Sequence, residues 1–325
     1  MTAQRLFGWR HAFDHPVVFW VTMGVAGLIV LALLGSVLLK GDLRREVLKR
    51  TLAWAAMAPL ILGPVLLGAA WHFAAVTLVS LICYAEFARA TGLFREKVTS
   101  LTVVLGILAV GFAALDNYYR LFVALFPIVV CVVAAASILP DSPKGYLQRV
   151  ALGALAFMLF GAGLGHLSFM GNDANYRPMV LLLLLGAQMN DVFAFCVGKT
   201  MGRRKLVPNT SPNKTVAGAV GALVLTTLLV ASLGRVIFRG TPLGGWGALV
   251  PLGLLLSVAG QLGDLTLSSI KRDLGIKDMG SIIPGHGGVL DRANSLLLSA
   301  PAVFHYVNYF VGFGLDQPAR IFTRG

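Results

Sequence analysis

The chain contains few charged residues for its length, and fewer acidic residues than basic ones. Asp, Glu, Lys and Arg make up 13% of its 325 residues, whereas 57% are hydrophobic. Soluble domains average about 25% charged residues, so the composition excludes an ordinary soluble protein and indicates a chain that folds in a lipid bilayer. The formal net charge is +13. Because membrane proteins collect Lys and Arg in cytoplasmic loops, we interpret this excess as a sign of topology and expect no nucleic-acid partner.

Cysteine is scarce as well. The three cysteines, Cys83, Cys131 and Cys196, each lie inside an apolar run, and none belongs to a CxxC pair. This spacing excludes a disulfide framework and a cysteine-based zinc site, and we expect three buried thiols.

Long apolar runs take up most of the chain, and about 20 apolar residues in a helix are enough to cross about 30 Å of hydrocarbon. The first run is too long for the core of a signal peptide. We therefore predict an all-α, polytopic integral membrane protein with about ten transmembrane helices. The runs are 17–39, two spans within 51–89 that break near Gly68 and His72, 98–115, 119–139, 150–170, 179–197, 216–238, 246–263 and 289–312.

The basic residues divide unequally between two sets of loops. The predicted loops 40–50, 89–97, 144–149, 199–214 and 271–292 hold 19 of the 27 Lys and Arg residues. By the positive-inside rule these loops are cytoplasmic and both termini face outward. We expect a bacterial inner-membrane protein whose active site faces the cytoplasm, with about six spans in residues 1–177 and a catalytic region of about four spans in residues 178–325.

Two acidic residues inside predicted spans need a partner, because a charge at the bilayer centre costs about 2.5–3.5 kcal/mol on insertion scales. Glu86 lies three residues before Arg89, and we interpret the two as an ion pair on one helix face, with a chemical role as the alternative. Asp191 follows a leucine run and lies about 10 Å below the predicted end of its helix near Gly198. It requires a cation, a metal ion or a water-filled cavity, and we favour a functional role over a structural ion pair.

The stretch 268–294, SSIKRDLGIKDMGSIIPGHGGVLDRAN, is polar and rich in glycine, and it lies between two apolar runs. Its cations suit phosphate oxygens, and carboxylates are ligands that Mg²⁺ takes, often together with substrate phosphates. Its glycines let backbone N–H groups approach an anion closely where the last helix begins. The cations are Lys271, Arg272, Lys277 and Arg292, and the carboxylates are Asp278 and Asp291 together with Asp264 just upstream.

A second polar stretch, GKTMGRRKLVPNTSPNKT at 198–215, follows Asp191. Ser211 and the proline after it are typical of a helix N-cap and first helical residue, so we expect a helix to begin there, with Lys214 in its first turn. A lysine at the positive end of a helix dipole is unfavourable unless it binds an anion, which favours Lys214 as a phosphate ligand. Arg203 and Arg204 are better explained as cytoplasmic loop charges, with ligand binding as the alternative.

Together these two stretches resemble a known family. The pattern Ser-x-x-Lys-Arg-x4-Lys-Asp-x-Gly-x2-Ile-Pro-x-His-Gly-Gly-x2-Asp-Arg, from Ser268 to Arg292, resembles the C-terminal motif of the phosphatidate cytidylyltransferases, or CDP-diacylglycerol synthases. The 198–215 stretch, with Asp191 before it, is similar to the upstream motif of the same family. The chain departs from the family pattern at Val216 and Ala217, where Trp and Glu are usual, and at Ala293 and Asn294, where a hydrophobic residue and Asp are usual.

The resemblance implies transfer of CMP from CTP to phosphatidic acid, with Mg²⁺ as cofactor and membrane lipids around the protein. A second cation and a homodimer remain open. A related CTP-dependent lipid kinase, a cytidylyltransferase for another lipid, a catalytically silent paralogue and a transporter remain as alternatives. The expected catalytic residues are Lys271, Asp278, His286, Asp291 and Arg292. The expected substrate-binding residues are Asp191, Ser211, Lys214, Ser268, Arg272, Lys277, Gly287 and Gly288, and the expected metal ligands are Asp264, Asp278 and Asp291.

Overall fold

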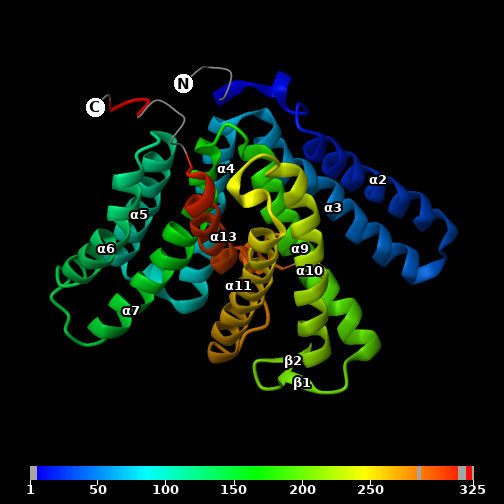
Figure 1. Ribbon diagram of the computed structural model, residues 1–325. Helices are drawn as coiled ribbons and strands as arrows, with labels where there is room; N and C mark the ends of the chain where they lie inside the picture. The colour runs from blue at the N-terminus through cyan, green and yellow to red at the C-terminus, as the bar shows by residue number, and fades with distance from the viewer. Residues whose placement is uncertain (1–5, 284–286, 314–319, 324–325) are drawn as a thin grey trace.

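The computed structural model describes residues 6–283, 287–313 and 320–323. Over these residues the protein is built almost entirely of helices (Figure 1), and the predicted all-α, polytopic fold is confirmed. The long helices are α2 (Pro16–Leu38), α3 (Gly41–Leu67), α4 (Ala69–Thr91), α5 (Lys97–Leu115), α6 (Tyr119–Ala136), α9 (Tyr176–Met201), α10 (Val216–Ile237), α11 (Trp246–Asp273) and α13 (Leu296–Val311). The shorter elements are η1 (Trp9–His11), η2 (Leu93–Arg95), α7 (Tyr146–Ala156), η3 (Phe157–Gly163), α8 (Leu164–Phe169), η4 (Met170–Asn172), η5 (Pro242–Gly244), α12 (Leu290–Ala293) and the strands β1 (Lys205–Val207) and β2 (Ser211–Thr215).

Nine helical stretches in the described part of the chain are long and apolar enough to cross a membrane. One of them, Tyr146–Asn172, runs continuously through α7, the π-helical segment η3, α8 and η4. The tenth predicted span, 289–312, is divided instead between α12 and α13. Because α13 has 16 residues, it is about 24 Å long, shorter than the hydrocarbon layer. The predicted break between α3 and α4 falls at Gly68, where φ is +138° and a Cβ would collide with the Leu6 carbonyl.

Two expectations about local structure are wrong. Residues 40–50 do not form a loop, since α3 begins at Gly41 and carries these basic residues on its first turns. Cys131 and Cys196 lie on the outer surface of the helices, and of the three thiols Cys83 alone is buried. A free thiol behaves as a small hydrophobic group, so it suits both the buried position of Cys83 and the outer helix surface at Cys131 and Cys196.

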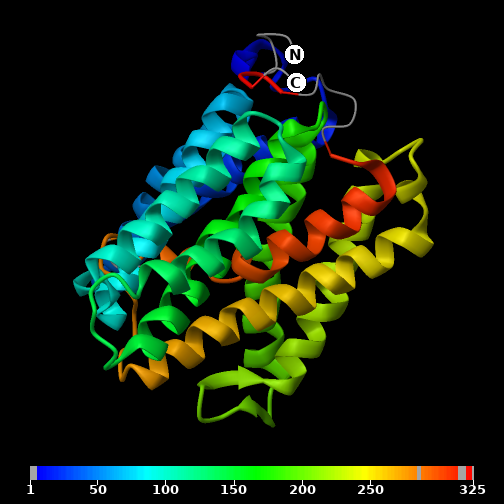
Figure 2. The same cartoon turned by 90° about the vertical axis from the view of Figure 1, so that its left-hand side faces the viewer.

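The first and last described segments of the chain and the β-hairpin lie at opposite ends of the helices. In Figures 1 and 2, the segment η1 and the last described residues lie at one end, and the β1–β2 hairpin lies at the other. At the first end, Arg177 donates to the carbonyl of Gly8 at 2.9 Å, and Asp116 accepts from the N–H of Ile321 at 2.9 Å. These contacts hold both described ends of the chain against the helices.

Loops predicted to share one face do meet at the hairpin end. Arg149, the last residue of the predicted 144–149 loop and part of the first turns of α7, lies 3.5 Å from Glu96 of the predicted 89–97 loop. Arg272, at the end of α11, donates to the carbonyl of Thr210 in the hairpin at 3.2 Å. The side of the membrane on which this face lies stays a prediction.

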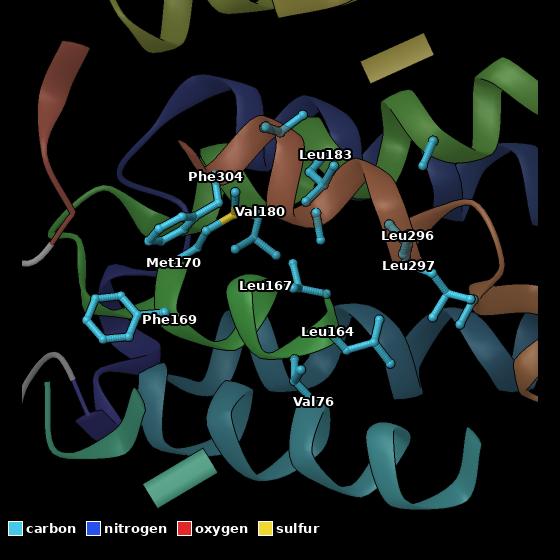
Figure 3. Packing of buried hydrophobic residues seen from close by; sticks show 14 of the residues in the cluster. Val76, Leu164, Leu167, Phe169, Met170, Val180, Leu183, Leu296, Leu297 and Phe304 are labelled. Carbon is cyan, nitrogen blue, oxygen red and sulfur yellow. The ribbon is translucent and has the colours of Figure 1, made fainter. Parts of the chain in front are cut away.

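The hydrophobic core lies where helices of the two halves of the chain meet. Figure 3 shows Val76 of α4 and Leu164 and Leu167 of α8 packing towards Val180 and Leu183 of α9. These five side chains are at most 8% exposed. The first six predicted spans and the last four therefore pack against one common core, while the division of the chain at residue 177 stays a prediction. Around this centre, α2 and α3 form an antiparallel pair at one side and α5, α6 and α7 lie at the other (Figure 1).

Candidate functional site

A buried polar network fixes α9, α10 and α11 against one another. Asn190 of α9 is fully buried, and its Oδ1 accepts from Thr226 Oγ1 of α10 at 3.1 Å and from Ser257 Oγ of α11 at 2.6 Å. Gln261, one turn after Ser257, donates to the same hydroxyl at 3.2 Å. Buried polar groups that are all bonded in this way fix a single arrangement of helices. The network lies next to Asp191, so it fixes the three helices that carry the polar site.

A cavity of about 200 Å³ lies beside this network, between the three helices and the hairpin. Asp191, Lys214 and Asp264 all line it, so three predicted site residues from distant parts of the sequence come together. Lys214 Nζ lies 2.5 Å from Asp264 Oδ2, and the two side chains are 22% and 19% exposed. The other lining residues are Ala194, Phe195, Leu206, Asn213, Thr215, Gly218, Ala219 and Gln261.

Asp191 lies deeper along its helix than its sequence position indicates. Helix α9 continues past Gly198 to Met201, so Asp191 lies about 15 Å from the end of the helix instead of about 10 Å. The expectation that this carboxylate needs a cation or a cavity agrees with its place beside Lys214 in the lining.

The helix predicted to begin at Ser211 begins instead at Val216, and this expectation is wrong. Residues 211–215 form β2, which pairs antiparallel with β1, and this pairing satisfies their backbone without a helix. Thr215 is the N-cap of α10, because its hydroxyl accepts from the N–H of Gly218 at 3.1 Å. Lys214 therefore lies on the hairpin and not in a first helical turn, while Ser211 is not in the cavity lining.

Asn294, one of the departures from the family pattern, contacts the polar cavity directly. Its Nδ2 donates to Asp264 Oδ1, and its own Oδ1 accepts from the N–H of Ser295 at 2.8 Å. The Asp264 carboxylate is thus bonded to Lys214 through one oxygen and to the Asn294 amide through the other. An amide in this place donates to Asp264, whereas a second carboxylate would repel it.

A second group of predicted residues gathers around Asp291 at the start of α12. Lys271 Nζ lies 2.8 Å from Asp291 Oδ1, and the N–H groups of Met279 and Gly288 donate to Oδ2 at 2.9 and 3.0 Å. The Asp291 side chain is 7% exposed. It therefore ties together the end of α11, the loop after it and the first turn of α12. The Gly288 N–H, predicted to approach an anionic substrate, is bonded to a carboxylate of the protein itself.

Glu86 belongs to the same group, and the predicted ion pair with Arg89 is wrong. The Glu86 side chain lies on α4 and the residue is 2% exposed. Its Oε1 accepts from the N–H of Val289 at 3.1 Å, and its Oε2 accepts from the N–H of Leu290 at 2.8 Å. The first N–H groups of α12, which have no partner within their own helix, are bonded to a carboxylate from another helix.

Carboxylates that suit Mg²⁺ occur in both groups. Among the residues that the structure describes, no three His, Cys, Asp or Glu side chains form a ready-made metal cluster. Mg²⁺ is commonly held by one or two carboxylates and completed by water and substrate phosphates, so this donor set fits it. Asp264 faces the polar cavity, and a Cβ at Gly287 would lie 3.1 Å from an oxygen of Asp291 and 3.5 Å from one of Asp278. The metal ligands stay a prediction.

The remaining predicted residues lie around these two groups. Helix α11 is uninterrupted to Asp273, so it carries Ser268 between the two groups. Arg272 and Lys277 are exposed at the end of α11 and in the loop after it. His286 lies outside the described residues.

An apolar cavity of about 190 Å³ adjoins the site between α3, α4, α8, α9 and the start of α12–α13. Arg292 is part of its lining, and so is Gln188, which precedes Asp191 on α9 by three residues. Arg292 is also close enough to Asp191 for the two charges to interact. The polar and apolar cavities therefore lie next to each other, with Asp191 facing the first and Arg292 the second.

Two residues next to the candidate site are not identified by the sequence analysis, although the sequence carries a signal for each. Asn190 is a polar residue directly before Asp191 in a leucine-rich run. Thr215 is a threonine directly before a long apolar run, which is typical of an N-cap. For Glu86 the sequence shows that a buried carboxylate needs a partner, but it does not show which one, because the partners lie more than 200 residues away in the chain.

These features define an integral membrane protein in which carboxylates and cations gather beside an apolar cavity. The chain belongs to the cytidylyltransferase family, whose family model matches residues 48–310. The resemblance seen in the sequence motifs is thereby confirmed.

Several relatives are similar over shorter segments. The chain is 35% identical over 215 residues to the uncharacterized protein YnbB of Escherichia coli, covering 64% of this chain and 69% of that protein. It is 41% identical over 170 residues to the phosphatidate cytidylyltransferase of Brucella suis, covering 50% of this chain and 60% of that enzyme. It is 39% identical over 139 residues to the phosphatidate cytidylyltransferase of Staphylococcus aureus, covering 43% of this chain and 52% of that enzyme. The match thus spans about half to three fifths of these two enzymes.

Proposed function

We propose that this protein is a membrane-embedded cytidylyltransferase that transfers CMP from CTP to phosphatidic acid, giving CDP-diacylglycerol and pyrophosphate. Family membership and the names of the relatives support the reaction class. The observation that carries the proposal is the pair of adjoining cavities: Asp191, Lys214 and Asp264 line a polar one, and Arg292 lines an apolar one. A nucleotide and a lipid need such different surroundings within reach of each other.

In this mechanism a phosphate oxygen of the lipid attacks the α-phosphorus of CTP. The new P–O bond forms as the bond from the α-phosphorus to the bridging oxygen of the β-phosphate breaks, and pyrophosphate leaves. No covalent intermediate with the protein is needed. The protein contributes position and charge: Lys214 binds the nucleotide phosphates in the polar cavity, and Arg292 binds the lipid phosphate at the edge of the apolar one.

Lys271 and the acidic residues complete the site. The Lys271 ammonium is held by Asp291, so it fixes that carboxylate and adds positive charge beside the loop. Asp264, together with Asp278 and Asp291 near Gly287, would hold Mg²⁺, which when bound neutralises charge on the phosphates. We place this end of the helices at the cytoplasmic face of the bacterial inner membrane, because the predicted cytoplasmic loops carry 19 of the 27 basic residues. A homodimer and a second cation stay predictions.

The proposal is tested with purified protein, labelled CTP, Mg²⁺ and phosphatidic acid in detergent or vesicles. We expect CDP-diacylglycerol and one pyrophosphate per turnover. Lys214→Met removes a cation from the phosphates, and a missing group of this kind typically lowers kcat by about 10²–10³. Lys205→Met is the matched control, since Lys205 lies on the same hairpin but is exposed and outside the cavity lining.

The products separate this proposal from its alternatives. Release of CDP instead of pyrophosphate would identify a lipid kinase. Product formed with another lipid phosphate, but not with phosphatidic acid, would identify a different acceptor. This alternative is tested because the chain departs from the family pattern at Ala217 and Asn294, where Glu and Asp are usual. Absence of any lipid-linked cytidine nucleotide with a panel of lipid phosphates would refute the proposal.

A further inference from the structure

We infer that Glu86 is a positioning residue for the reaction: from α4 it fixes the turn that carries Asp291 and Arg292, without touching either substrate. The catalytic consequence rests on the proposed function. The geometric part, that Glu86 holds this turn, stands on contacts alone.

Three successive N–H groups at the start of α12 are bonded to two carboxylates. The Gly288 N–H donates to Asp291, and the N–H groups of Val289 and Leu290 donate to Glu86, at 3.0, 3.1 and 2.8 Å. Asp291 lies within the turn that it helps to close, and through Lys271 it ties that turn to α11. Glu86 ties the same turn to α4, more than 200 residues away in the chain.

The space around the carboxylate indicates a close fit between α4 and two parts of the loop. A Cβ at Gly288 would lie 2.5 Å from Glu86 Oε2, and one at Gly280 would collide with Oε1. Both residues are glycine, so the backbone approaches the carboxylate from two sides. Even a methyl group on the Gly280 side would push Glu86 away from its N–H partners.

The bonds explain why a carboxylate is needed here. Each oxygen of Glu86 accepts one N–H, so both backbone donors are satisfied inside a buried site. In Glu86→Gln one of the two positions becomes an NH₂ group, which faces an N–H as donor against donor. The turn must then shift, and with it Asp291 and Arg292. When a residue that hydrogen-bonds to a catalytic or metal-binding residue is replaced, activity or metal affinity typically falls about 10- to 100-fold.

The first test compares Glu86→Gln with Glu96→Gln in the full-length protein. Glu96 is a suitable control because it lies just after α4 on the same side, where its side chain is 39% exposed and near Arg149. We expect Glu86→Gln to lower kcat about 10- to 100-fold, with KM for CTP changed less than about threefold, and Glu96→Gln to keep near-normal values. Turnover of Glu86→Gln within twofold of the wild type would overturn the inference.

The second test does not depend on activity. Amide hydrogen exchange is measured in a chelator without substrate, and we expect the Val289 and Leu290 amides to exchange at least tenfold faster in Glu86→Gln, with α9 and α10 unchanged. A uniform increase over all helices would mean that Glu86 merely stabilises the fold, and would overturn the inference. Because this readout needs no turnover, it also separates failure of the inference from failure of the proposed function.

A double-mutant cycle with Gly280→Ala completes the test. If the added methyl group acts by displacing Glu86, it speeds exchange at Leu290 in the wild-type background and has little further effect in Glu86→Ala. Residues in direct contact show this kind of non-additivity, whereas independent sites add. Additive effects of Gly280→Ala and Glu86→Ala would contradict the inference.

Discussion

Replacing Asn294 with aspartate is expected to set two carboxylates against each other at the polar cavity. In the native protein the Asn294 amide donates to Asp264 Oδ1, and Asn294 is 8% exposed. Two carboxylate oxygens about 3 Å apart repel by about 5 kcal/mol at an effective dielectric constant of about 20. Lys214, 2.5 Å from the other oxygen of Asp264, offsets part of this repulsion. We therefore expect Asn294→Asp to cost about 3 kcal/mol of stability when no metal ion is present.

Mg²⁺ should reverse this loss, because a cation bound between the two carboxylates turns repulsion into ligation. The assay is the apparent melting temperature of the purified protein in detergent, measured in a chelator and in millimolar Mg²⁺. We expect Asn294→Asp to melt about 5 °C or more below the wild type in the chelator and to recover most of the difference in Mg²⁺.

Asn294→Ala is the matched control for this experiment. It removes the same hydrogen bond to Asp264 and adds no charge, so its loss should be equal in chelator and in Mg²⁺. If Asn294→Asp and Asn294→Ala lose equal stability and neither responds to Mg²⁺, the reasoning about charge at this site is wrong. The same result would remove Asp264 from the predicted metal ligands.

Three further predictions concern other parts of the molecule. In otherwise cysteine-free protein in intact cells, a cysteine at Lys205 should be protected from an impermeant thiol reagent and one at Arg177 labelled; the reverse pattern would invert the topology. Thr215→Val removes the N-cap of α10 and should cost about 1 kcal/mol of stability, seen as a lower melting temperature, whereas Thr215→Ser should cost little. Burial alone would raise the pKa of Asp116, but hydrogen bonds from residues 321–323 outweigh it and lower the pKa below the ordinary 3.8. The anchoring of this segment is thus complete above about pH 4 and is lost as the pH falls through the lowered pKa, which exchange protection of the segment would show; protection that persists at lower pH would contradict this.

The sequence was sufficient for the features that depend on local composition. Apolar runs predict the helical membrane fold, and the residue types of the two polar stretches predict which parts of the chain carry the candidate site. Both Lys214 and Asp264 are among the predicted site residues, and the structure brings them into contact. The family motif was readable because its residues are consecutive in the chain.

The features that depend on contacts between distant segments were not predictable. Ser211 had good N-cap chemistry, but pairing of its segment with β1 moved the start of the helix to Val216. Glu86 had a basic residue within reach on its own helix, yet its carboxylate bonds the backbone of Val289 and Leu290. In both cases a partner far along the chain outweighed the local one, and no local pattern names such a partner.

The buried network around Asn190 has a consequence for how the protein is made. Thr226 and Ser257, which satisfy the Asn190 side chain, are synthesised 36 and 67 residues after it. Helix α9 therefore enters the membrane while its amide and the Asp191 carboxylate still lack these neighbours. The aspartate costs about 2.5–3.5 kcal/mol at a helix centre, whereas each leucine contributes about −0.3 to −0.6 kcal/mol on the same kind of scale. The five leucines at 181–185 offset the insertion free energy of the aspartate by a comparable amount, so α9 can insert into the membrane before α10 and α11 are made.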